Sequence, residues 1–100
     1  MDRYPKKSSD TAFRVLGDEA IIVNFDDSFF YNLNKVGTFI WNRCDGQHSV
    51  DEIAEALTEE YEVSPETASH DCREFLNELA EQGLLRWNPG PEAQNEDSIT

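Results

Sequence analysis

Long hydrophobic runs are missing from this chain of 100 residues, and basic residues are scarce. No stretch approaches the roughly 18 consecutive apolar residues that a membrane-spanning helix needs. The first ten residues, MDRYPKKSSD, lack the apolar segment of a signal peptide. Lys and Arg number 8 against 21 Asp and Glu, a formal net charge of −13, which would repel a phosphate backbone. These absences argue against a membrane protein, a secreted protein and a nucleic-acid binder, and they favour the cytoplasm.

Cysteine is also sparse, because the chain has only 2, and they form no CxxC pair. Cys44 and Cys72 each share a helical spacing with apolar neighbours, which favours buried, reduced thiols over a disulfide or a metal role. His48 and His70 stand apart in the sequence and are interpreted as surface residues. The chain also lacks a glycine-rich phosphate loop and a recognisable nucleophile–base pair. We therefore expect no metal, no cofactor and no enzymatic activity.

The chain is long enough for one small domain, which we place at residues 11–87. Residues 1–10 are polar and are interpreted as a flexible arm, and residues 88–100 are rich in Pro, Gly and polar residues and are interpreted as a disordered tail. Short alternating patterns predict strands over residues 11–16, 20–25 and 28–33. The links between them are short, which favours an antiparallel three-stranded meander.

After this meander the hydrophobic period changes from 2 to 3.6, which predicts helices. Asn34 is a candidate N-cap for the first helix, Ser49 to Glu52 form a capping box for the second, and Ser64-Pro65 begins the third. Gly83 is expected to end the third helix. The predicted fold class is therefore α+β and winged-helix-like, with a three-stranded meander followed by three helices.

The acidic residues concentrate between residues 51 and 81, where eleven acids face one base, a net charge of −10. One interpretation is that these are solvated helix faces that keep a small protein soluble. The other is an acidic surface that steers a basic partner. The sequence leaves both open.

An ordered series of residues resembles the PqqD family over residues 11–87. In order, the series is Leu33-Asn34, Gly37, Ile40-Trp41, Asp45-Gly46, Val50, Glu52-Ile53, Leu57, Tyr61, Val63, Asp71, Phe75-Leu76, Glu78-Leu79 and Gly83-Leu84-Leu85. The resemblance implies a RiPP recognition element, a small domain that binds the leader of a ribosomally made precursor peptide. It further implies that the domain presents this peptide to a modifying enzyme, often a radical SAM protein, as in pyrroloquinoline quinone biosynthesis.

The last predicted strand would be an edge strand, and residues 28–34 contain no Lys, Pro or acid to protect that edge. An extended peptide could add to it as a further strand, and the resemblance implies that the leader lies between this strand and the third helix. The predicted peptide-binding residues of the strand are Phe29, Phe30, Tyr31, Asn32 and Leu33. On the third helix we expect the less acidic flank to line the groove, namely Ser69, Arg73, Leu76, Asn77 and Ala80.

Other interpretations remain at this point. The aromatic residues of the strand are also consistent with an ordinary core, and Arg73 is consistent with an exposed neighbour of the acids. The open strand would equally suit a structural or regulatory dimer that pairs edge to edge, whereas a winged-helix nucleic-acid binder conflicts with the acidic third helix. We expect a monomer or an edge-strand dimer.

Overall fold

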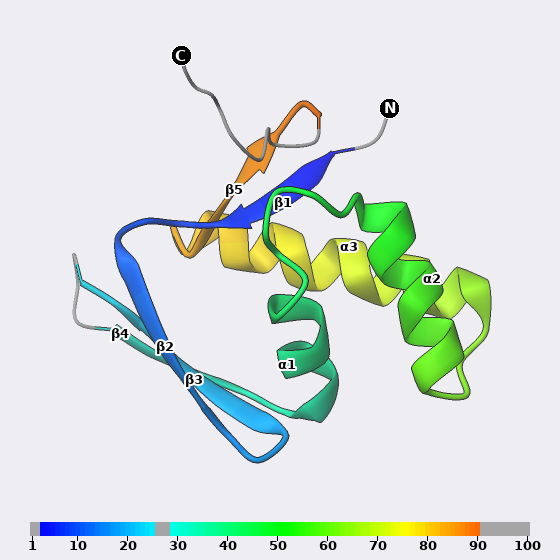
Figure 1. The fold of residues 1–100 in the computed structure, drawn as a ribbon, viewed down its shortest axis with the longest axis horizontal. Coiled ribbons are helices and arrows are strands. Elements are labelled where there is room, and N and C mark those ends of the chain that lie inside the picture. Colours follow the sequence, from blue (N-terminus) through cyan, green and yellow to red (C-terminus); the bar gives the residue numbers. More distant parts are fainter. Residues whose placement is uncertain (1–2, 26–28, 91–100) are drawn as a thin grey trace.

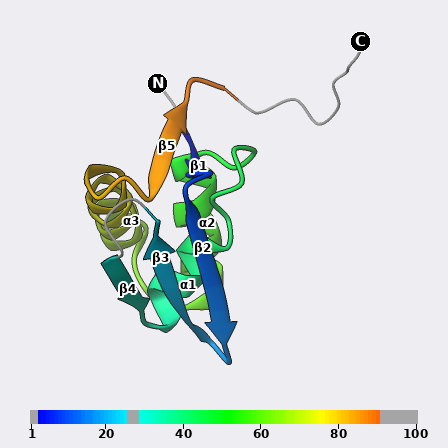
Figure 2. The same cartoon turned by 90° about the vertical axis from the view of Figure 1, so that its left-hand side faces the viewer.

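The structure is a computed structural model that describes residues 3–25 and 29–90. Figures 1 and 2 show the main sheet on one side of the molecule, the helices on the other, and β1 (Tyr4–Lys7) and β5 (Leu85–Asn88) together above α3 (Pro65–Glu81). Among the described residues, no helix is long and apolar enough to cross a membrane. The architecture agrees with the predicted α+β class of a three-stranded antiparallel sheet followed by three helices, and adds the second strand pair.

The sheet consists of β2 (Thr11–Leu16), β3 (Glu19–Asn24) and β4 (Phe29–Leu33), in the order β2-β3-β4 with antiparallel pairing. The predicted start at residue 28 lies outside the described residues. Gly17 has a φ of 66° in the turn between β2 and β3, a conformation that glycine adopts without strain. Ile22 in the central strand is fully buried and pairs with Phe13 on one side and Tyr31 on the other. This register defines the face of the sheet that packs on the helices.

All three helices begin at the predicted caps. In α1 (Lys35–Trp41) the side chain of Asn34 accepts a hydrogen bond from the Gly37 amide at 2.8 Å. The predicted capping box of Ser49 precedes α2 (Val50–Glu60), and Ser64 caps α3 (Pro65–Glu81). After α3 the chain turns at Gly83, whose φ is 78°. Local hydrogen-bonding signals therefore set these helix starts.

The core lies between the sheet and the helices. Trp41, Ile53, Leu76 and Leu79 are fully buried, and Phe13 packs edge-on against Trp41 with 5.6 Å between ring centroids. Both cysteines are buried free thiols, as predicted. Burial raises the pKa of each thiol from 9.0 to about 12. These thiols therefore act as small apolar groups of the core at neutral pH.

The predicted flexible arm differs from the structure. Tyr4–Lys7 form β1, which pairs antiparallel with β5 (Leu85–Asn88). Pro5 is buried, its carbonyl accepts a hydrogen bond from the Gly46 amide at 2.9 Å, and Lys7 donates its side-chain ammonium to the Cys44 carbonyl at 3.3 Å. Tertiary contacts thus order a segment that looks polar in the sequence. The predicted tail, residues 88–100, also differs at its start, because Asn88 is the last residue of β5; residues 91–100 lie outside the described residues.

Candidate functional site

The edge of β4 is the first element of the candidate site. β4 pairs with β3 along one side, and no strand of the described chain pairs with its other side. Figure 2 shows β4 at the border of the sheet, on the side of α3. An edge strand of this kind offers unpaired backbone groups to another extended chain. The predicted open edge is therefore present in the structure.

A hollow of about 310 Å³ lies beside this edge. Its walls come from three elements: the end of β4, one side of α1 and the middle of α3. Leu33 and Ile40 are buried core residues that contribute apolar surface, and Phe75 of α3 is partly buried. The complete lining is Tyr31, Asn32, Leu33, Asn34, Val36, Gly37, Ile40, Asp71 and Phe75. The hollow can therefore accept an apolar side chain from a peptide lying along β4.

A second, wider hollow continues along α3 and is strongly acidic. It shares Asp71 and Phe75 with the first hollow, so the two lie side by side. Its volume is about 570 Å³, and neither lining includes a Lys or Arg residue. Its complete lining is Asp71, Glu74, Phe75, Asn77, Glu78 and Glu81. We call the two hollows together the β4–α3 groove.

Tyr31 connects the two walls of this groove. Its side chain is partly buried, and its hydroxyl donates a hydrogen bond to the Glu78 carboxylate. Burial, followed by this hydrogen bond and the negative charge of Glu78, raises the pKa of the Tyr31 hydroxyl to about 12. At the other end of the sheet, the side-chain amide of Asn24 donates to the Gln82 carbonyl at 3.0 Å. β4 therefore runs beside the second half of α3, with Leu33 near Phe75 and Tyr31 near Glu78.

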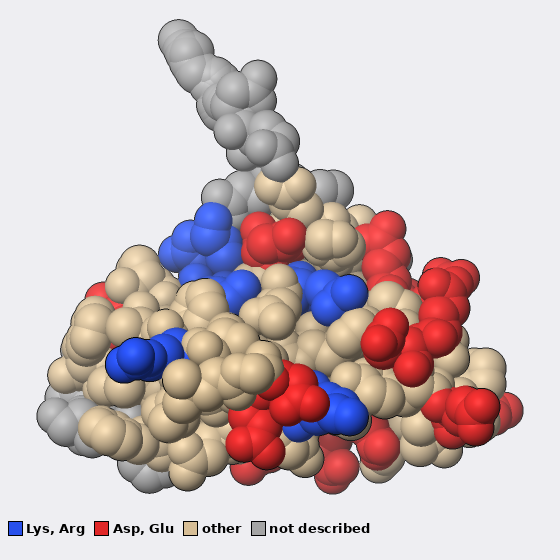
Figure 3. Space-filling model, turned by 60° about the horizontal axis from the view of Figure 1, so that its bottom comes forward, with Lys and Arg blue, Asp and Glu red and all other residues tan. Residues whose placement is uncertain are grey.

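The surface charge of the molecule is divided between its two sides. Figure 3 shows acidic side chains gathered toward the helical side, while the side of the three-stranded sheet shows few acidic side chains and some Lys or Arg. Two cationic side chains near the groove form ion pairs outside it. Arg73 donates to Asp51 of α2 at 3.1 Å, and the Lys35 ammonium lies 3.7 Å from Asp18. The groove therefore presents a negative wall beside an apolar one.

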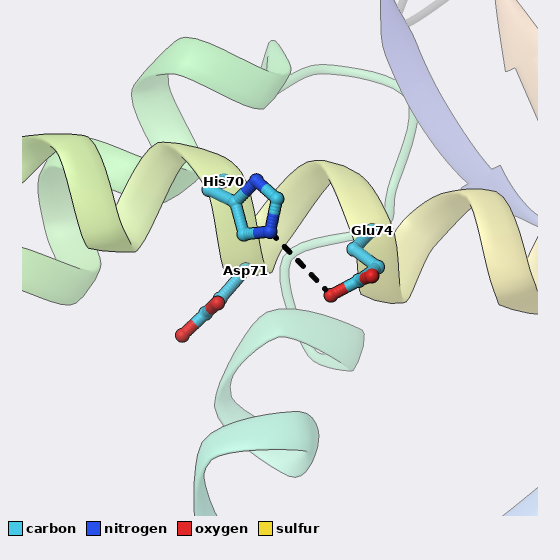
Figure 4. Close-up of side chains that lie close together, drawn as sticks. All are labelled: His70, Asp71 and Glu74. Carbon is cyan, nitrogen blue, oxygen red and sulfur yellow. Dashed lines mark ion pairs between the residues drawn. The ribbon is translucent and has the colours of Figure 1, made fainter.

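His70, Asp71 and Glu74 form a small cluster on the exposed surface of α3 (Figure 4). Their candidate ligand atoms lie within 4.8 Å of one another, and the His70 Nε2 atom is 3.7 Å from a Glu74 oxygen. All three side chains are exposed, and exposed acidic groups of this kind are common on soluble helices. The cluster contributes negative charge to the groove and carries no metal assignment.

The strand residues of the predicted site lie at the open edge. Tyr31 and Leu33 face the helices, and Leu33 is almost completely buried. Asn32 lines the hollow, whereas the Phe30 side chain is 65% exposed and, by the register with Val23, belongs to the other face of the sheet. Phe29 begins β4, and its side chain lies outside the described part of the structure.

The helical residues of the predicted site are mostly placed elsewhere. Ser69 lines a hollow shared with α2, Arg73 binds Asp51 of α2, and Leu76 is fully buried in the core. Ala80 is partly buried against the core, and only Asn77 lines the acidic part of the groove. The structure therefore brings to β4 the flank that carries Asp71, Phe75 and Glu78, which the sequence interpretation did not select.

From the sequence alone, the opposite flank of α3 is the better candidate for the groove, because it carries fewer acids. The helical pattern identifies an apolar centre near Cys72, Phe75 and Leu79, but it does not show which flank meets α2 and which meets β4. The signal that was available is Phe75, a large aromatic residue of the apolar stripe that follows Asp71 and Glu74 and precedes Glu78 in the sequence. Aromatic side chains contribute much of the energy of cores and interfaces, so Phe75 was a candidate for a contact with a ligand.

Comparisons with known proteins agree with this geometry. The sequence profile of the family described as Coenzyme PQQ synthesis protein D (PqqD) matches residues 19–85. A search of curated proteins finds no match. Among solved structures, TbiB1 in complex with the TbiA(beta) leader peptide is 30% identical, with a TM-score of 0.75 over 81% of this chain and 94% of that chain.

A second solved structure, lasso peptide synthetase B1 complexed with the leader peptide, is 22% identical. Its TM-score is 0.75, and the match covers 83% of this chain and 98% of that chain, which supports the fold. The profile match spans more than half of the sequence, and the 30% identical structure covers most of both chains. The chain therefore belongs to the PqqD family.

Proposed function

We propose that this protein is a recognition element for a ribosomally made precursor peptide. It binds the leader segment of that peptide as an added strand along β4 and presents the peptide to a modifying enzyme. One observation carries the proposal: β4 has an open edge beside a groove whose other wall is α3. In this proposal the protein binds and presents the peptide and does not itself catalyse a reaction.

Strand addition fits both properties of this site. Backbone hydrogen bonds along β4 supply affinity that does not depend on the peptide sequence. Alternate side chains of an added strand point to the same face as Tyr31 and Leu33, where the groove lies. Selectivity then comes from the side chains that the groove accepts. The complex of TbiB1 with a leader peptide supports this assignment, because that protein is 30% identical to this one.

The modifying enzyme is proposed to be a radical SAM protein or another peptide-modifying enzyme, in a pathway of the pyrroloquinoline quinone type or a related one. Membership of the PqqD family supports such a partner. We place the complex in the cytoplasm, which agrees with two cysteines that are both free thiols.

Amide chemical shifts test where a peptide binds. Peptides that bind the full chain would first be selected from a displayed library of random 12-residue sequences. One of them is then titrated into the ¹⁵N-labelled protein. The expected result is that the amides of Phe30 to Leu33 and those around Phe75 shift most. Shifts confined to α2 would overturn the proposal.

Single N-methylation of the same peptide tests how it binds. Each N-methyl group removes one backbone donor and leaves the side chains unchanged. Strand addition predicts that affinity falls at every second position, because alternate amides of an edge-paired strand point toward β4. A uniform effect along the peptide would contradict strand addition.

Sedimentation measurements test separately whether the free protein forms the edge-strand dimer. If the free protein is a dimer that dissociates when the peptide is added, a second copy occupies β4 in the absence of peptide. If the free protein is a monomer, the edge stays available at the concentrations measured. A dimer that persists with bound peptide would place the dimer contact elsewhere.

A further inference from the structure

We propose that the peptide recognised by this protein carries a lysine or arginine two positions away from a large apolar residue. The apolar side chain occupies the hollow against Leu33, Ile40 and Phe75. The basic side chain meets the carboxylates of α3 beside Tyr31. This inference rests on the proposed function and names the class of peptide that the groove accepts.

The two hollows of the groove follow one another along α3, beside β4. The apolar hollow lies at the Leu33 end, where α1 and Phe75 meet the strand. The acidic hollow extends from Asp71 to Glu81, and the hydrogen bond from Tyr31 to Glu78 fixes its position relative to β4. A peptide that runs along the strand therefore passes from an apolar environment to an acidic one.

Strand geometry sets the spacing of the two side chains. Residues two apart in a strand are about 7 Å apart and point to the same face. A side chain opposite Leu33 points into the apolar hollow, and the side chain two positions away lies opposite Tyr31, next to Glu78. The same spacing holds whether the peptide runs parallel or antiparallel to β4. The recognised pattern is therefore an apolar residue and a basic residue separated by one residue.

The charge of the groove selects the basic side chain. Four acids line the second hollow, namely Asp71, Glu74, Glu78 and Glu81, and neither hollow has Lys or Arg in its lining. An acidic peptide residue here would meet carboxylates of the same charge. A basic residue would form charge-assisted hydrogen bonds, which are shorter and stronger than neutral ones.

Glu78 remains able to accept a ligand while it is bonded to Tyr31. A carboxylate has two oxygens with about four acceptor positions, and the Tyr31 hydroxyl uses one of them. The exposed cations near the groove do not compete for these oxygens, because Arg73 is paired with Asp51 and Lys35 lies beside Asp18. The carboxylate wall is therefore available to a peptide cation.

Selection from the random 12-residue library tests the inference. The library is panned against the full chain and against two triple variants, with EDTA present so that no divalent cation neutralises the acids. The groove variant is Asp71→Asn/Glu74→Gln/Glu78→Gln. The control is Glu55→Gln/Glu59→Gln/Glu62→Gln, which removes the same number of charges from exposed positions on or just after α2. All six positions are exposed, so both variants are expected to fold, and circular dichroism checks this.

The expected result is an excess of Lys and Arg two positions from a large apolar residue in peptides that bind the parent and the control. The excess should disappear with the groove variant. In one selected peptide, replacing the basic residue with Glu should weaken binding to the parent about tenfold, which corresponds to about 1.4 kcal/mol. The same replacement should have a much smaller effect on the groove variant.

Two outcomes would overturn the inference in different ways. Peptides that shift the amides of Phe30 to Leu33 but show no basic excess would refute the proposed peptide class and leave strand addition intact. A library that yields no peptide acting at β4 would refute the proposed function together with this inference.

Discussion

Gly37 controls how closely α1 approaches α3 at the apolar hollow. It is a buried residue of α1, and an added Cβ atom would lie 3.3 Å from the Cζ atom of Phe75 and 3.3 Å from the Oδ1 atom of Asn34. Both distances are tighter than ordinary van der Waals contact. The absence of a side chain at this position therefore lets the Phe75 ring form the floor of the hollow.

Replacing Gly37 with alanine should reduce peptide affinity more than stability. The methyl group would push the Phe75 ring into the hollow, and we expect binding to weaken about tenfold, or about 1.4 kcal/mol. The gain of about 1 kcal/mol in helix propensity should offset much of the crowding in the free energy of unfolding. Calorimetry of a selected peptide and urea unfolding measure the two effects.

The matched control for this substitution is Gly90→Ala, because nothing lies within 4 Å of a Cβ atom built there. This variant should bind as the parent does. Unchanged affinity in a folded Gly37→Ala variant would show that the hollow plays no part in peptide binding.

The buried thiols predict a loss of stability at alkaline pH. Their pKa in the folded state is raised from 9.0 to about 12, so the folded protein holds these protons after the unfolded chain has lost them. The contribution is fully present below about pH 9 and declines as the pH rises to about 12. Urea unfolding between pH 8 and pH 11 should show this decline, and a Cys44→Ala/Cys72→Ala variant should show a shallower one. Identical slopes would contradict the assignment.

Among the secondary-structure elements, the sequence predicted the helix starts, because local hydrogen bonds determine them. The caps at Asn34, Ser49 and Ser64 act within three residues, and each one starts a helix in the structure. The pairing of β1 with β5 joins residues about 80 positions apart, and YPKK gives no local sign of a partner. The flank of α3 that faces β4 is likewise decided by packing against α2.

Deleting residues 1–7 tests whether β1 is part of the folded domain. The deletion removes the buried Pro5 and the backbone hydrogen bonds of β1 to Cys44 and Gly46. We expect the free energy of unfolding to fall by about 2–4 kcal/mol, as for other losses of buried apolar groups. Urea unfolding of the shortened chain, beginning at Ser8, measures the difference. A flexible arm would predict a change within about 0.5 kcal/mol.

At the scale of the whole molecule, the net charge of −13 is carried mainly by the helical side. Exposed charges act over roughly 10 Å at 0.1 M salt, so this side influences a charged peptide before contact. Long-range attraction changes the rate of association more than the rate of dissociation. The composition thus predicted the sign of the field, and four of the acids, Asp71, Glu74, Glu78 and Glu81, line the β4–α3 groove.

For a selected basic peptide, the association rate should fall as the salt concentration rises. Between 0.05 M and 0.5 M salt we expect a decrease of about tenfold in the association rate and a much smaller change in the dissociation rate. Stopped-flow fluorescence with a labelled peptide separates the two rates. The Glu74→Gln/Glu78→Gln variant should show a weaker salt dependence. An association rate that does not change with salt would contradict steering by the acidic surface, whose role would then be to keep the protein soluble.

The pairing of β1 with β5 has a consequence for how the domain can be engineered. Tyr4 and Asn88 are opposite each other in the register, so a short linker could join the two strands into a closed loop. New chain ends could then be opened at the exposed turn of Gly17 and Asp18, where β2 meets β3. Such a circular permutant would keep every wall of the β4–α3 groove and move both ends to the far tip of the sheet.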